Sequence, residues 1–81
     1  MSRKHHYLKT ETEYFQAQES GQKTFEVRRN DRDYKVGDMV VLDETVNGIK
    51  TGRTLPGKEI IYILYGGNYG IEKGYCVLQL R

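Results

Sequence analysis

The sequence predicts an α+β fold, in which a strand and one helix precede four or five further strands. Thr10 and Glu13 have the spacing of a capping box, and Gly21 lies where a helix over residues 11–20 would end. After Gly21, apolar and polar residues alternate with the two-residue period of a β-strand. Asn47-Gly48 is the strongest hairpin signal, because both residues tolerate the positive φ that the turn requires.

The strands are expected at residues 6–10, 24–28, 39–42, 59–65 and 75–80. Leu55-Pro56-Gly57 is expected to interrupt the chain before the strand at residues 59–65, and Gly66–Gly70 is expected to form a loop. Only 37% of the residues are hydrophobic, which predicts a thin core. A sheet that curves into a partial barrel covers such a core best.

Length and composition exclude several classes of protein. A chain of 81 residues is too short for an enzyme with separate cofactor and substrate domains, and it predicts a single domain over residues 1–81. The longest apolar run, Ile60 to Tyr65, is far shorter than the ~20 residues of a membrane-spanning helix. Residues 1–6 lack the apolar stretch of a secretory signal, so we expect a cytoplasmic protein without membrane association.

No cofactor motif or metal-ligand pattern is visible, so we expect neither a cofactor nor a metal. Cys76 is the only cysteine, which excludes an intrachain disulfide and a thiolate zinc site, and we expect it to be buried. His5 and His6 are adjacent on a strand, so their side chains point to opposite faces. They are interpreted as surface histidines, although His6 is also within reach of a neighbouring cleft.

The net charge of +2 arises in the first part of the chain, where residues 1–35 hold eight basic and six acidic residues. This excess of positive charge is too small for a protein that binds duplex DNA through many phosphate contacts. It is compatible with a local site for one phosphate, nucleotide or short single strand.

The densest polar cluster is Lys23 to Arg32, in which alternation places Glu26 and Arg28 on one strand face with Lys23 at its start. A carboxylate between two cations on a concave face would suit a polar ligand such as a base edge and its phosphate. The alternative is a solvated face whose charges pair with one another. Asn30 and Asp31 are either turn formers or ligand contacts.

Tyrosine is abundant, with seven residues in the chain. Tyr62, Tyr65, Tyr69 and Tyr75 surround the last loop. They form either a stacking platform for unpaired bases or the rim of a small core. The core interpretation is favoured for Tyr62 and Tyr75, whereas Tyr69 stays open.

Several motifs together resemble an uncharacterised family of small bacterial and phage proteins, which looks like an ASCH branch of the PUA-like superfamily. The motifs are His6-x-Leu8-Lys9, Glu13-Tyr14-Phe15, Gly21-x-Lys23-Thr24-Phe25-Glu26-Val27-Arg28, Asn30-Asp31-Arg32, Val36-Gly37-Asp38, Thr51-Gly52-Arg53, the strand Ile60–Leu64 and Gly74-Tyr75-x-Val77-Leu78. The resemblance covers nearly the whole chain.

This resemblance implies a PUA-like fold, a small curved β-barrel of five to six strands with one N-terminal helix beside a cleft. It also implies a module that binds RNA or a modified nucleotide. The residues that it assigns to the cleft are Lys23, Glu26, Arg28, Asn30, Asp31 and His6.

Two other function classes stay open. Some ASCH-like proteins are amidohydrolases that act on acetylated cytidine, with a threonine nucleophile three positions after the motif lysine. Glu26 stands at that position here, so a reaction would need Glu26 as the base that activates water and Lys23 as the oxyanion stabiliser. The third class is a protein-interaction module without a small ligand.

Overall fold

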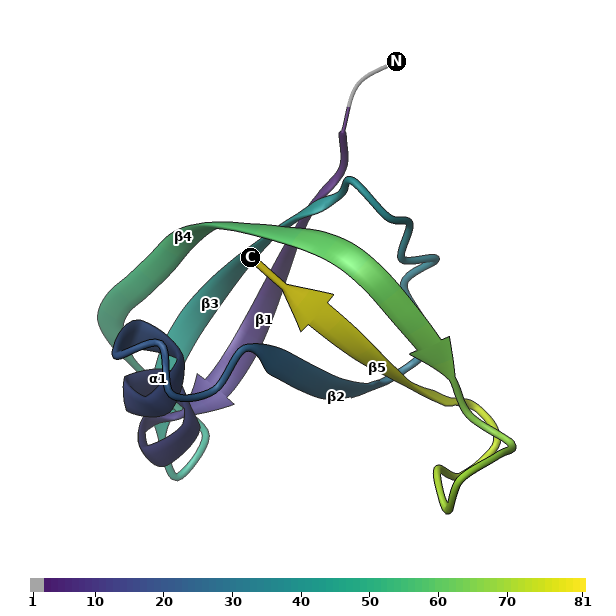
Figure 1. The fold of residues 1–81 in the computed structure, drawn as a ribbon. Coiled ribbons are helices and arrows are strands. Elements are labelled where there is room, and N and C mark those ends of the chain that lie inside the picture. Colours follow the sequence, from purple (N-terminus) through teal and green to yellow (C-terminus); the bar gives the residue numbers. More distant parts are fainter. Residues whose placement is uncertain (1–2) are drawn as a thin grey trace.

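The computed structural model describes residues 3–81 and confirms the α+β class, with one short helix and a five-stranded mixed sheet (Figure 1). The elements are β1 (His5–Glu11), α1 (Thr12–Glu19), β2 (Phe25–Arg29), β3 (Met39–Val46), β4 (Ile49–Tyr65) and β5 (Tyr75–Leu80). The strand order is β1-β3-β4-β5-β2. Only β1 and β3 run parallel, and the other neighbours are antiparallel.

The sheet is strongly curved but not closed, so the structure does not confirm a barrel. β1 and β2 are the two edge strands. Arginine side chains from β2 and from the segment that follows it bind to β1 where a closed barrel would have backbone pairing. Arg28 Nη2 donates to the Lys9 carbonyl oxygen at 2.9 Å. Arg32 Nη1 donates to the Tyr7 carbonyl oxygen at 2.8 Å. We call this junction the β1–β2 seam.

The predicted capping box is wrong, although the helix itself is confirmed. Thr10 still belongs to β1, and its hydroxyl donates to the Leu8 carbonyl oxygen. The helix begins only at Thr12, because pairing with β3 holds the chain extended as far as Glu11. Gly21 has a φ of 81°, which confirms the glycine predicted to follow the helix.

The Asn47-Gly48 hairpin is confirmed. Asn47 and Gly48 have φ values of 50° and 80°, and Val46 pairs with Ile49 across the turn. This turn joins β3 to the long strand β4, which bends across the molecule in Figure 1.

The predicted interruption at Leu55-Pro56-Gly57 is wrong, because β4 runs through it without a break. The partner of Leu55 is Leu42, whereas the partner of Lys58 is Val40, so β4 has one extra residue at this point. Such a bulge accommodates a proline, which lacks the N–H of a regular ladder, and the φ of 83° at Gly57.

The core is thin, as predicted, and lies on the inner side of the curved sheet, with Phe15 of α1 packed into it. Its buried hydrophobic residues are Leu8, Phe15, Tyr34, Val40, Leu42, Ile60, Ile63, Cys76, Leu78 and Leu80. The burial of Cys76 is confirmed, and it raises the pKa of the thiol. Within residues 3–81, no helix has the length and apolar character needed to cross a bilayer.

Candidate binding cleft at the β1–β2 seam

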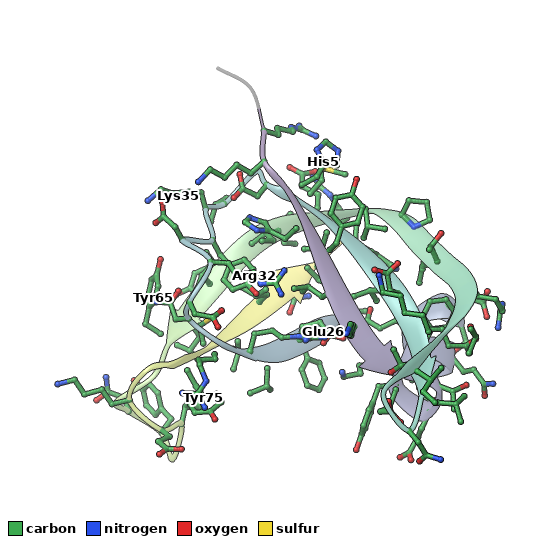
Figure 2. All side chains as sticks on the ribbon, turned by 180° about the vertical axis from the view of Figure 1, so that it is seen from behind. His5, Glu26, Arg32, Lys35, Tyr65 and Tyr75 are labelled. Carbon is green, nitrogen blue, oxygen red and sulfur yellow. The ribbon has the colours of Figure 1, made fainter. Side chains whose placement is uncertain are left out.

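A cleft of about 450 Å³ lies at the β1–β2 seam, between the end of β1, the helix and β2. Figure 2 shows Glu26 and Arg32 beside β1 at this junction. The lining residues are Lys9, Thr10, Glu11, Tyr14, Lys23, Phe25, Glu26, Val27 and Arg28. The cleft therefore contains three of the six residues that the sequence assigned to it, namely Lys23, Glu26 and Arg28.

The strand β2 turns its polar face inward and its apolar face outward. Glu26 is only 3% exposed, whereas Phe25 and Val27 are 43% and 54% exposed. The charged face of β2 is therefore not turned toward solvent. Its carboxylate, Glu26, does pair with the neighbouring cations Lys23 and Arg28. The inward turn places a carboxylate and two cations at the cleft rather than in bulk water.

Glu26 holds the centre of this arrangement. Its Oε1 accepts hydrogen bonds from Gln18 Nε2 at 3.0 Å and from Lys23 Nζ at 3.1 Å. Its Oε2 accepts from Arg28 Nε at 3.2 Å and from Arg28 Nη2 at 3.1 Å. A carboxylate has about four lone-pair positions, so the three side chains fill the acceptor capacity of Glu26.

Arg28 is fixed from two sides. Besides Glu26, its Nη2 contacts the Lys9 carbonyl oxygen and the Thr10 hydroxyl, at 2.9 Å and 3.2 Å. Among residues 3–81, the structure gives its Nη1 no hydrogen-bond partner. A guanidinium held in this way keeps one preoriented donor group for an incoming acceptor.

Lys23 lies between two aromatic rings at the mouth of the cleft. Its ammonium is 5.0 Å from the ring centroid of Tyr14 and 5.3 Å from that of Phe25. These distances are within the range of cation–π attraction. The same ammonium contacts Glu26, so Lys23 connects the buried carboxylate to the half-exposed aromatic rim.

The second carboxylate of the cleft, Glu11, is committed to the hairpin. It accepts hydrogen bonds from the Thr45 hydroxyl and from the backbone amides of Asn47 and Gly48. The bond from Thr45, followed by that from Gly48, holds the pKa of Glu11 below its usual value. With both carboxylates engaged, the exposed ammonium of Lys9 forms no ion pair within residues 3–81.

The structure places His6, Asn30 and Asp31 outside the cleft. His6 is 6% exposed, and its Nε2 lies 2.8 Å from Asp38. Its ring packs against that of Tyr34 in a tilted arrangement, with ring centroids 4.7 Å apart. The interpretation of His6 as a surface histidine is therefore wrong. Asn30 and Asp31 are exposed after β2, where the Asp31 amide donates to the Arg29 carbonyl oxygen, a short-range bond in keeping with turn formation.

The surroundings of Asp38 predict that the stability of the fold depends on acid pH. Burial raises its pKa, but the hydrogen bond with His6 and those from two backbone amides outweigh burial, so the pKa of Asp38 lies below its ordinary 3.8. Unfolded chains then bind protons more readily than folded ones, and the stabilisation present above pH 3.8 is lost as the pH falls through the lower folded value.

We therefore expect the free energy of unfolding to fall below about pH 4, with a shallower slope for Asp38→Asn. Urea unfolding followed by circular dichroism at several acidic pH values measures both slopes. Equal slopes in the variant and the parent protein would show that Asp38 takes no part in the acid response.

The tyrosines around the last loop lie outside the cleft. Tyr62, Tyr65 and Tyr69 are 63%, 55% and 87% exposed, and none of them lines the cleft. Tyr62 is therefore not a core residue. Tyr75 is partly buried, and the guanidinium of Arg29 lies 5.3 Å from its ring centroid.

Sequence reasoning missed the contribution of β1 and the aromatic rim. Lys9 and Thr10 reach the cleft only because the two ends of the sheet meet, a long-range contact without a local sequence signal. For the helix, the sequence did contain a local signal, because Tyr14 and Gln18 are four positions apart and therefore lie on one face. Within residues 3–81, no group of three potential metal ligands comes together.

Comparison with known proteins places the chain in a family. Residues 5–80 match a family described as a domain of unknown function, DUF3850. The chain belongs to the DUF3850 family. This match confirms the small, uncharacterised family that the motifs predicted. The match does not extend to the ASCH and PUA-like assignment.

A curated relative comes from a bacteriophage. The uncharacterised 12.9 kDa protein in the GpA 3' region of Escherichia phage P2 is 38% identical over 58 residues. The aligned region covers 72% of this chain and 53% of the phage protein, so the DUF3850 chain spans about half the length of that relative. A phage relative agrees with the family of small bacterial and phage proteins that the motifs resemble.

Proposed function

We propose that this DUF3850 domain binds RNA or a nucleotide in the cleft at the β1–β2 seam. The observation that carries the proposal is the convergence of Lys9, Lys23 and Arg28 on one cleft whose two carboxylates are already engaged by the protein itself. The similarity of the motifs to PUA-like, ASCH-type modules supports the same class of ligand.

The geometry divides the roles differently from the sequence-based expectation. From the sequence, Glu26 was expected to contact a polar ligand together with the two cations, but its acceptor positions are filled by three neighbouring side chains. We assign it the role of holding Lys23 and Arg28 in place. Arg28 Nη1 and the ammonium of Lys9 then contact the phosphate or a base acceptor.

Binding also suits Glu26 better than hydrolysis does. A general base must accept a proton from water within hydrogen-bond distance. Glu26 offers no free acceptor position until Gln18, Lys23 or Arg28 withdraws. We therefore propose a binding module, and the amidohydrolase becomes an outcome of the same experiment if acetylated cytidine releases acetate.

The test is an NMR titration of isotopically labelled protein with nucleoside monophosphates, acetylated cytidine and short single-stranded RNAs. We expect shifts at Lys9, Lys23 and Arg28, and a loss of affinity of at least about fivefold for Lys9→Ala, on the order of 1 kcal/mol. Lys73→Ala is the matched control, because Lys73 is an exposed lysine outside the cleft. Equal losses in both variants, or no shifts at the cleft with any ligand, would overturn the proposal.

A further inference from the structure

The mouth of the cleft carries two aromatic rings that the fold does not need for its core. Tyr14 comes from α1 and Phe25 from β2, and they are 50% and 43% exposed. Phe25 is exposed because β2 turns Glu26 inward, which forces the flanking apolar side chains outward. Tyr14 and Phe25 therefore present aromatic surface at the cleft and not in the core.

Both rings already contact a cation of the protein itself, the ammonium of Lys23. The ammonium of Lys23 lies 5.0 Å from the Tyr14 ring centroid and 5.3 Å from the Phe25 ring centroid. Ring faces that attract a cation also stack nucleobases, and such stacking is tolerant of base identity. The exposed parts of Tyr14 and Phe25 therefore offer an aromatic surface beside a charged one.

The cleft is divided into two chemical halves. The aromatic rings of Tyr14 and Phe25 form one part of the lining, and the cations Lys9 and Arg28 form another. A nucleotide has the same division, since its base is aromatic and its phosphate is anionic. The cleft volume of about 450 Å³ also falls within the range of roughly 300–1,000 Å³ that small-molecule sites occupy.

We propose that the ligand carries an unpaired base, which stacks on Tyr14 and Phe25 while its phosphate contacts Lys9 and Arg28. This inference rests on the proposed function and narrows it to nucleotides and single-stranded RNA. Bases within a duplex are stacked on their neighbours and offer no free face, so double-stranded RNA binds more weakly than the same sequence unpaired.

The first test compares ligands with and without a base and needs no variant. AMP and ribose 5-phosphate share the sugar phosphate, and only AMP can stack. We expect AMP to bind about five- to 150-fold more tightly and to shift the ring protons of Tyr14 and Phe25 upfield. A short single-stranded oligoadenylate is expected to outcompete its duplex with oligouridylate.

The second test removes the rings but keeps apolar side chains. Phe25→Leu and Tyr14→Leu are expected to weaken AMP binding at least fivefold each and to leave ribose 5-phosphate binding unchanged. Tyr62→Leu is the control, because Tyr62 is 63% exposed and lies outside the cleft. Nitrogen–proton correlation spectra establish that the variants are folded.

The possible failures are distinguishable. If AMP and ribose 5-phosphate bind equally, and Lys9→Ala weakens both, the stacking inference is wrong while the phosphate site stands. If neither AMP nor single-stranded RNA binds the parent protein, the proposed function and the stacking inference are both wrong. Binding of duplex as tightly as single strand would also overturn the inference.

Discussion

Glu26→Ala is expected to lower the free energy of unfolding by about 3 kcal/mol, a large part of the ~5–15 kcal/mol that stabilises a typical domain. The carboxylate is 3% exposed and accepts hydrogen bonds from Gln18, Lys23 and Arg28. Its removal leaves two cations and an amide facing one another at the cleft without their common acceptor. Urea unfolding followed by far-ultraviolet circular dichroism measures the loss.

The control for Glu26→Ala is Glu19→Ala. Glu19 also contacts an arginine, with Oε2 at 2.6 Å from Arg53 Nη2, but its side chain is 43% exposed. An exposed ion pair contributes about 0–1 kcal/mol, so this variant should stay close to the parent protein. Similar small losses for both variants would mean that the Glu26 network does not hold the seam together.

Phe15→Ala is expected to cost about 3–5 kcal/mol and to abolish ligand binding at the same time. Phe15 is fully buried, and α1 contributes only Phe15 and Gln18 to the interior. An eight-residue helix has little stability of its own, so tertiary packing must hold it in place. Releasing the helix also withdraws Tyr14 from the cleft and Gln18 from its hydrogen bond to Glu26.

Tyr14→Ala separates packing from recognition, because Tyr14 is the neighbouring residue and is 50% exposed. We expect this variant to lose affinity for AMP while its unfolding midpoint in urea changes little. Phe15→Leu, which keeps most of the buried volume, should recover much of the stability. A Phe15→Ala protein with normal stability and normal binding would show that docking of α1 is dispensable.

Local signals in the sequence were sufficient for the α+β class and for several elements. The positive φ tolerance of Asn47 and Gly48 located the hairpin, and the two-residue period placed Glu26 and Arg28 on one face of β2. The structure brings both of them together with Lys23 at the cleft. These features depend on neighbours along the chain, which the sequence displays directly.

The predictions that were wrong concern features that depend on distant parts of the chain. Pairing with β3 extends β1 past Thr10 and delays the helix, and a bulge opposite β3 lets β4 pass through Pro56. The alternation in β2 identified its two faces but not which one is buried, since that depends on the Arg28 contacts to β1. His6 was misjudged for the same reason, because Asp38, its partner, lies 32 positions away.

The arginine bridges of the seam also protect the edge of the sheet against other chains. An exposed edge strand is a template on which a foreign strand can add and begin aggregation. Arg32 and Arg28 already occupy the carbonyl oxygens of Tyr7 and Lys9 on β1. An invading strand must first expel two guanidinium groups, so these side chains keep the open edge of the sheet from being extended.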